Sequence, residues 1–252
     1  MKKALFFLLF CTSNAWASCV PSVVQVSSHE VTTAQLFPTF ITTMTATTAG
    51  DAVACFVREG LNNTDNFTMS DEQGQTWLQT NVKYFIDPAA TTRRASVFYF
   101  PNSLSITFPK VTFSTGGGCS LISMTCIEMA NMASSVMLDT DTFNGLTTAT
   151  SHTTTGLTTA NANDLLVVFL ETGGAVTSFA GSNNYTMSAN AKLTRTAVEY
   201  ETVASVLTST TTVITWTTTQ QSASDFVAFK GCQAATNTPC QSIDAFGVGC
   251  GL

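Results

Sequence analysis

The sequence is built from short apolar segments that are separated by turn-forming residues. The segments are rich in β-branched and aromatic residues, which is typical of β-strands in a packed sheet. No window carries the long 3.6-residue apolar periodicity that a packed helix requires. We therefore predict an all-β protein. The clearest strand segments are Ala52–Val57, Ser96–Phe100, Lys110–Phe113, Leu165–Leu170, Thr212–Trp216 and Phe226–Phe229.

The composition excludes two other classes of protein. Charged residues make up only 10% of the chain, whereas hydrophobic residues make up 44%. Coiled coils and helical bundles need far more charged residues on their solvent-facing side. Disordered chains lack the aliphatic and aromatic residues that are plentiful here. The composition therefore favours a packed sandwich or barrel.

The apolar segments recur in the same order in two halves of the chain. Residues 52–57 are echoed by 165–170, at an offset of about 113. Two equivalent halves of this kind fit a sandwich made of two Greek keys. We predict an antiparallel two-sheet β-sandwich, jelly-roll-like and built from two similar halves at about 31–132 and 150–231, within a single domain over 18–231. The other matched segments are 94–98 with 196–200, 111–114 with 214–217, and 124–129 with 224–229.

The turn Ser70–Trp77 carries the pattern D-x-x-G-x-T-aromatic. Together with the Asp-led strands 51–57 and 164–170 and the closing strand 225–229, it resembles uncharacterised secreted bacterial β-sandwich modules that repeat such a hairpin. The resemblance covers about residues 30–231. It implies a jelly-roll or concanavalin-like sandwich at an exported surface, and it implies no chemistry.

The first 17 residues have the pattern of a signal peptide. Two lysines precede an apolar run at residues 4–10, and a small-x-small cleavage pattern ends at Ala17. The run is too short to span a bilayer, and no later stretch is apolar enough to do so. We expect a protein without a membrane span that is secreted, periplasmic or on the cell surface after cleavage near Ala17.

Seven cysteines follow residue 17. In an oxidising compartment they favour disulfides, and the odd number predicts one unpaired thiol. Cys240 and Cys250 close a short loop and are the expected pair. We interpret residues 232–252, which are rich in Cys and Gly, as a C-terminal tail pinned to the sandwich.

Nucleic acid is excluded as a partner by the charge pattern. Acidic residues outnumber basic ones by 16 to 10, and the only adjacent basic pair after residue 17 is Arg93-Arg94. Phosphate contacts need clustered Lys and Arg. No cofactor is expected, because the chain has neither a phosphate-binding loop nor a dinucleotide fingerprint.

Three aromatic residues are candidates for ligand binding: Trp77, with Tyr84 nearby, and Tyr185. An exposed aromatic face suits sugar rings and other planar groups. The competing interpretation places Trp77 in the core. Loops at the ends of the sandwich would form the contact region. These loops are residues 62–66, 87–94 and 182–185.

Glu128 is the most plausible catalytic carboxylate, because it shares a strand face with apolar residues. A Glu in such a position must be protonated or paired, and the candidate partners are Arg58, Arg93 and Arg94. The competing interpretation is a strand end at which Glu128 reaches water. A glycosidase needs two facing carboxyl groups roughly 5–9.5 Å apart. Glu199 and Glu201 share one strand face and are interpreted as a solvated surface.

Two weaker candidates complete the set. Asp139 and Asp141 form a DxD in a loop, where they could bind calcium, although ordinary turn chemistry explains them as well. His29 and His152 are the only histidines, and neither belongs to a recognisable catalytic motif. No other metal site is expected.

The sequence thus predicts an exported, non-enzymatic β-sandwich for binding or surface structure, with a carbohydrate or cell-surface ligand as the expected partner. The alternative is a secreted concanavalin-like glycoside hydrolase that uses Glu128. An unpaired cysteine or open edge strands would also allow self-association.

Overall fold

The computed structural model describes residues 19–33, 38–60, 64–85, 93–114 and 120–232. In these residues the chain is almost entirely β, and the one helical element is a short 3-10 turn, η1 (Ala189–Ala191). The paired strands are all antiparallel. The predicted all-β sandwich class is confirmed.

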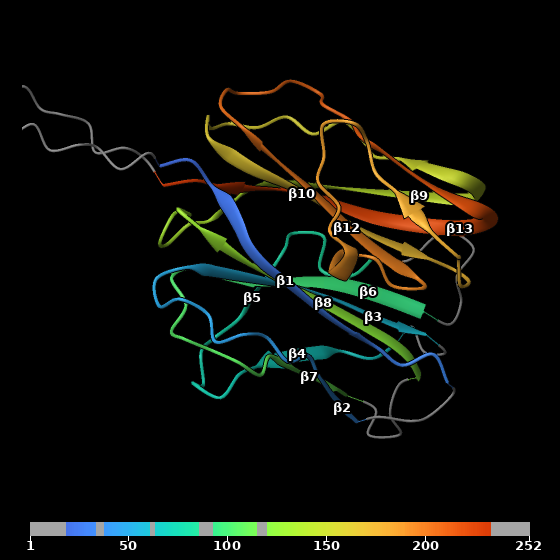
Figure 1. Ribbon diagram of the computed structural model, residues 1–252, viewed down its shortest axis with the longest axis horizontal. Helices are drawn as coiled ribbons and strands as arrows, with labels where there is room; N and C mark the ends of the chain where they lie inside the picture. The colour runs from blue at the N-terminus through green and yellow to red at the C-terminus, as the bar shows by residue number, and fades with distance from the viewer. Residues whose placement is uncertain (1–18, 34–37, 61–63, 86–92, 115–119, 233–252) are drawn as a thin grey trace, which may run out of the picture.

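Two main sheets pack face to face as the central layers of the molecule (Figure 1). The first sheet has the strand order β1 (Ser22–Glu30), β8 (Ser120–Ala130), β3 (Ala52–Gly60), β6 (Arg93–Phe100) and β5 (Leu78–Gln79). In the second sheet β13 (Val213–Lys230) pairs with β9 (Leu138–Thr153), with β10 (Asp164–Thr172) and with β11 (Phe179–Ala180), and β12 (Thr196–Val203) follows β10.

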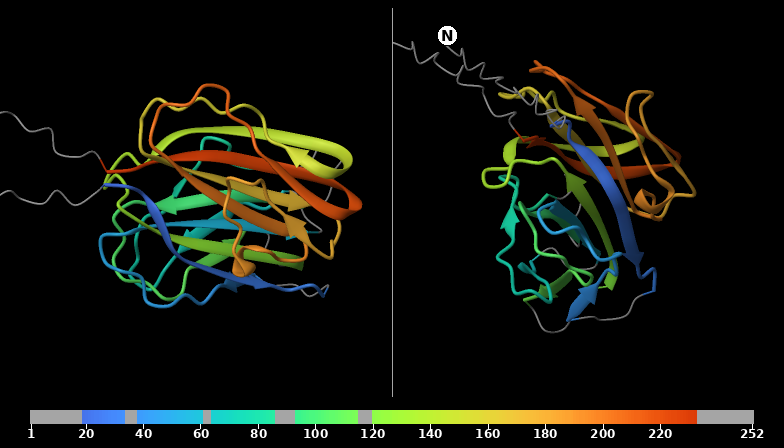
Figure 2. Two further views of the ribbon diagram at one scale, coloured as in Figure 1. Left: turned by 45° about the horizontal axis from the view of Figure 1, so that its top comes forward. Right: turned by 60° about the vertical axis from the view of Figure 1, so that its left-hand side comes forward.

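Each main sheet carries a further layer on its outer face. A small sheet of β2 (Thr39–Ile41), β7 (Lys110–Phe113) and β4 (Phe67–Ser70) covers the first sheet. The second sheet is covered by its own long strands, because β9 and β13 bend and their residues 149–153 and 213–220 turn back over it (Figure 2). The segments predicted at 212–216 and 226–229 are therefore two ends of one bent strand.

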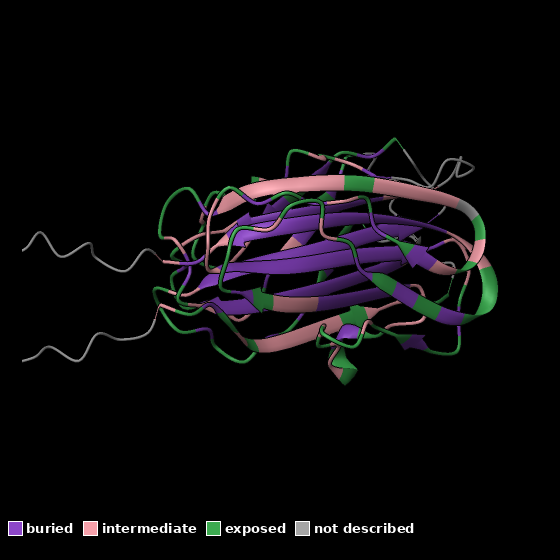
Figure 3. Cartoon of the chain, turned by 90° about the horizontal axis from the view of Figure 1, so that it is seen from above, coloured by how far each residue is buried: buried purple, intermediate pink, exposed green. Residues whose placement is uncertain are grey.

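Three apolar cores result from this layering. On β3, Ala54 and Phe56 face the core between the main sheets, whereas Cys55 and Val57 face the core under the small sheet. The third core lies under the bent part of β13, against Val168 of β10. Because apolar cores lie on both of their faces, β3 and β10 are buried at every position (Figure 3). This explains why their sequences are continuous apolar runs without alternation.

The two halves of the chain have equivalent strand orders. The order β8-β3-β6 in the first sheet matches β13-β10-β12 in the second, and all strands of a main sheet come from one contiguous half. The chain therefore crosses between the main sheets once, after β8, whereas a jelly roll alternates between its sheets. The second sheet begins at Leu138, earlier than the expected boundary at about residue 150.

The strand pairing corrects one of the sequence matches by one residue. Phe56 pairs with Val97, and the equivalent Phe169 pairs with Val198. Val97 and Val198 both face the central core, at an offset of 101 rather than 102. A shift of one residue reverses the faces of a strand, so the match of 94–98 with 196–200 is wrong in register.

Two disulfides join strands that are distant in the sequence. Cys55 on β3 lies directly opposite Cys126 on β8, and Cys19 is bonded to Cys232 just after β13. The second bond ties the start of the domain to its end. The predicted Cys240–Cys250 pair, the signal peptide and the C-terminal tail lie outside the described residues.

Several edges of the main sheets are covered by other parts of the chain. Along β1, Ser28 and Val26 bond to Asn190 of η1, which lies beside the strand in Figure 1. Along β12, the backbone of Tyr200 pairs with Thr186. Covered edges disfavour strand-to-strand self-association. Among the described residues, no helix is long and apolar enough to cross a membrane.

Candidate functional site

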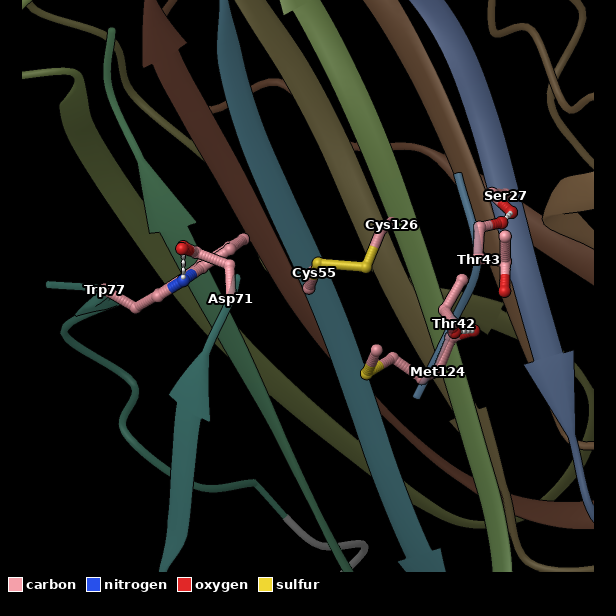
Figure 4. The surroundings of a disulfide bond; sticks show 8 residues. All are labelled: Ser27, Thr42, Thr43, Cys55, Asp71, Trp77, Met124 and Cys126. Carbon is pink, nitrogen blue, oxygen red and sulfur yellow. Dashed lines mark hydrogen bonds between the residues drawn. A yellow bond between two sulfur atoms is a disulfide. The ribbon is translucent and has the colours of Figure 1, made fainter. Parts of the chain in front are cut away.

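The predicted Asp71–Trp77 hairpin is instead a turn between two sheets, because β4 before it pairs with β7 in the small sheet and β5 after it pairs with β6 in the first main sheet. This Asp71 turn is organised around one carboxylate. Asp71 Oδ1 accepts bonds from the backbone N–H groups of Gln73 and Gln75, at 2.8 and 3.2 Å. Its Oδ2 accepts the indole N–H of Trp77 at 2.8 Å (Figure 4). Gly74 has φ of +70°, a conformation that glycine adopts without strain. The D-x-x-G-x-T-aromatic pattern is therefore a structural motif that fixes the turn between β4 and β5.

The predicted ligand-binding aromatics do not form one site. Trp77 and Tyr84 both pack against the core under the small sheet. The Tyr84 hydroxyl accepts the backbone N–H of Phe67, and the Arg94 guanidinium lies 4.2 Å from its ring centre. Tyr185 packs on the third core, which is the outer core of the second half. The polar groups of Trp77 and Tyr84 are thus engaged within the fold.

Glu128 is buried, and none of the predicted arginines is its partner. Its two oxygens accept bonds from the Gln25 side chain and the Thr48 backbone, both at 2.6 Å. The Asp51 carboxyl lies within hydrogen-bonding reach, and burial together with the Glu128 charge raises the pKa of Asp51. A pair in direct contact leaves no room for a sugar ring between its carboxyl groups.

The expected arginine partner is instead found at the opposite end of β3. Arg58 is buried and its Nε lies 3.2 Å from Glu171 Oε2, while Arg93 Nε lies 3.5 Å from the same oxygen. Arg58 and Glu171 occupy equivalent positions of β3 and β10, so this ion pair joins the two halves. Burial lowers the pKa of Arg58.

Asp139 and Asp141 lie on β9 and point to different neighbours. Both oxygens of Asp139 accept bonds from residues 160–161, at 2.7 and 2.6 Å. Both oxygens of Asp141 accept bonds from residues 81–82, at 2.6 and 2.7 Å. No group of three or more His, Cys, Asp or Glu that could hold a metal ion is present in the described ranges. This geometry gives the calcium hypothesis no support.

Buried carboxyl groups are more numerous than the sequence indicated. Burial, and then the nearby Asp139, raises the pKa of Asp164 to about 7. Asp225 is fully buried, and burial raises its pKa well above the ordinary range. Glu199 was expected on a solvated face, but it is fully buried beside Thr212 and its pKa is raised to about 7, mainly by desolvation. That expectation was wrong because β13 and its neighbouring loops cover the outer face of the sheet.

His152 is also buried and structural. It lies on β9 rather than in a polar linker, and its ring nitrogens lie 2.8 Å from the hydroxyls of Ser222 and Ser224. Desolvation lowers its pKa to about 4. Both serines are fully buried, so this arrangement offers no nucleophile to a substrate.

One surface pocket borders the Asp71 turn, and we call it the Asp71 pocket. It has a volume of about 290 Å³ and is lined by Ile41, Asp71, Glu72, Phe108 and Lys110. Phe108 is 49% exposed, and the Glu72 carboxylate accepts its backbone N–H and that of the preceding residue. The Lys110 ammonium has no ion-pair partner among the residues described. No local sequence pattern indicated that Phe108 would be exposed.

A second pocket, the junction pocket, lies where β1 of the first half meets the second half. Its volume is about 390 Å³, and it is lined by Glu30, residues 176–179 and residues 192–194. The apolar side chains of Val176 and Phe179 are buried in its wall. The hydroxyl-bearing residues Thr177, Ser178 and Thr194 also line it.

The chain matches no protein-family model, no curated protein and no solved structure. The geometry of the two pockets is therefore the basis for any functional assignment.

Proposed function

We propose that the protein is an exported, non-enzymatic β-sandwich that binds a carbohydrate or a glycan-bearing cell surface through the Asp71 pocket. The observation that carries this proposal is the half-exposed ring of Phe108 in a pocket that Lys110 also lines, where Lys110 has no ion-pair partner within the described ranges. An aromatic ring packs on the CH face of a sugar, and an ammonium donates bonds to its hydroxyls. Backbone bonds to Glu72 hold the ring in place.

The alternative, a glycoside hydrolase that uses Glu128, has weaker support. A second carboxyl, Asp51, does lie beside Glu128, but the two are in contact rather than separated across a cleft. Glu128 is also only 1% exposed. Export itself is supported by the two disulfides, which favour an oxidising compartment.

A glycan array with the mature protein tests the proposal. Phe108→Ala is expected to weaken binding at least tenfold, because it removes the stacking surface. Phe143→Ala is the matched control, since Phe143 is 41% exposed on β9 and does not line the Asp71 pocket. Absence of binding to every glycan, or equal losses in the two variants, contradicts the proposal.

The same protein preparation tests the alternative. We expect no release of reducing sugar from a polysaccharide panel. Release that disappears in Glu128→Gln while the variant keeps its melting temperature would establish the hydrolase instead.

A further inference from the structure

Three titratable side chains from three adjacent strands meet at one end of the second sheet. Asp164 on β10 lies directly opposite Lys230 on β13, so their side chains share one face of the sheet. On the other side of β13, Lys230 Nζ lies 4.0 Å from Oδ1 of Asp139 on β9. The ladder between β9 and β13 shifts register beside Asp139, and such a shift changes the direction of a side chain. The fold thus places one amine beside two carboxyl groups.

Asp164 is suited to hold and transfer a proton. It is fully buried, and no N–H or hydroxyl group of the described residues bonds to either of its oxygens. The Asp139 carboxyl lies within hydrogen-bonding reach, and burial raises the pKa of Asp164 to about 7. Two carboxyl groups in contact share a proton, because it is costly for both to be charged. A carboxyl group in this state can act as an acid and then as a base.

The surroundings of Asp139 favour attack on its carboxyl carbon. The backbone N–H of Ala160 donates to Oδ2 at 2.7 Å, and the Asn161 amide donates to Oδ1 at 2.6 Å. Such donors stabilise the negative charge that develops on oxygen when a nucleophile adds to the carbon. The flexible stem of Lys230 allows Nζ to approach that carbon to the attack distance of about 3–3.5 Å.

Burial also favours a neutral amide over an ion pair at this position. The Asp139 side chain is 3% exposed, so its carboxylate loses most of its hydration in the folded protein. An amide has no charge to desolvate. Holding the amine and the carboxyl group side by side raises their effective concentration to as much as about 10⁵–10⁸ M. The Lys230 side chain is 25% exposed, so a released water molecule has a path to solvent.

We propose that Lys230 Nζ and the Asp139 carboxyl group condense to an intramolecular amide bond, with Asp164 as the proton relay. The bond from Nζ to Cγ forms, and one bond from Cγ to oxygen breaks. The Lys230 ammonium gives up two protons, which leave with that oxygen as water. Asp164 passes these protons on and ends protonated, as it began. A cation and an anion become one neutral amide, so charge is conserved and no oxidant or reductant is needed.

The amide bond ties β9 to the end of β13, close in sequence to the Cys19–Cys232 disulfide. The end of the domain is then held by two kinds of covalent bond, and reduction breaks only one of them. This inference goes beyond glycan binding and does not depend on it.

Intact mass spectrometry of the mature protein, reduced and denatured, tests the proposal. Most molecules should be lighter than the sequence mass by one water molecule. A chymotryptic digest should contain a branched peptide in which Lys230 is joined to Asp139. A population at the full sequence mass overturns the proposal. Loss of water without the branched peptide also overturns it, because a succinimide at an aspartate removes the same mass.

Three variants separate the roles of the residues. Lys230→Arg keeps the positive charge but cannot form this amide, so it should have the full sequence mass. Lys192→Arg is the matched control and should keep the mass deficit, because Lys192 lines the junction pocket instead. Asp164→Asn cannot relay protons and should cross-link at least about tenfold more slowly, so that chain without the cross-link remains after purification.

A cooperative thermal transition shows which variants are folded. A mass deficit that persists in Lys230→Arg contradicts the assigned bond. Complete cross-linking of folded Asp164→Asn at the wild-type rate contradicts the assigned proton relay.

Discussion

A single carboxylate, Asp71, accounts for the most recognisable motif of the sequence. Its oxygens accept bonds from two backbone N–H groups, the Gln75 amide and the Trp77 indole. The sequence predicted the turn correctly because Asp and Gly carry strong local preferences. It did not show that the turn joins two different sheets. Nor could it show that the Trp77 N–H bonds back to Asp71, since that depends on how Trp77 packs against the core under the small sheet.

Replacing Asp71 with Ala should therefore destabilise the turn between β4 and β5. Loss of several bonds to a charged acceptor should lower the free energy of unfolding by about 2–3 kcal/mol. The Trp77 emission should shift to longer wavelength as the indole gains water. Urea unfolding followed by tryptophan fluorescence measures both effects. Asp71→Asn keeps one oxygen acceptor and should lose about half as much; an Ala variant as stable as the wild type would refute the assigned role.

At the scale of elements, the positions of β3, β7 and β10 were predictable from apolar runs bounded by turn residues. Their covering layers were not, because a strand buried on both faces has the same local sequence whichever element lies above it. The prediction that 212–216 and 226–229 are separate strands failed for a similar reason. The sequence of β13 contains no Gly or Pro to mark its bend, and the structure shows register shifts in its pairing with β9 between Thr215 and Ser222.

The two disulfides should differ in what their removal does. Cys19–Cys232 attaches β1 to the end of β13, so the Cys19→Ala/Cys232→Ala variant should show faster amide hydrogen exchange in β1 and at residues 230–231. Amides of β3 and β10 should keep their protection. The Cys55→Ala/Cys126→Ala variant should lose about 2–4 kcal/mol of global stability instead. Uniform exchange changes in the first variant would contradict the local role.

At the scale of the whole molecule, buried acids should control the response to pH. Asp164 and Glu199 have pKa values of about 7 in the folded protein, above the ordinary carboxyl range, and the pKa of Asp225 is also raised. The folded state therefore holds protons that the unfolded state releases, and this stabilisation is lost as the pH rises through about 7. His152 has the opposite effect, because its pKa is lowered to about 4 in the folded protein. The unfolded state binds a proton at this histidine more readily, so the free energy of unfolding falls as the pH drops below 6.5.

The net effect favours acidic conditions, because at least two carboxyl groups oppose one histidine. The melting temperature should be higher at pH 5 than at pH 8, by on the order of 5 °C. Glu199→Gln should flatten this dependence, since the amide does not titrate. Scanning calorimetry at the two pH values measures the difference. A protein that is more stable at pH 8 would contradict the assigned burial of these acids.

The residues alone were enough to predict the all-β class, the order of the main strands along the chain, the recurrence of that order in two halves and the Asp71 turn. Each of these follows from side-chain periodicity or from the conformational preferences of a few neighbouring residues. The burial of the acids, the pairing of the cysteines, the correspondence between β6 and β12 in the two halves and the residues that line the two pockets became visible only in the folded chain. Burial and pairing join residues far apart in the chain, such as Glu30 and Thr194, and local sequence carries no record of such a contact.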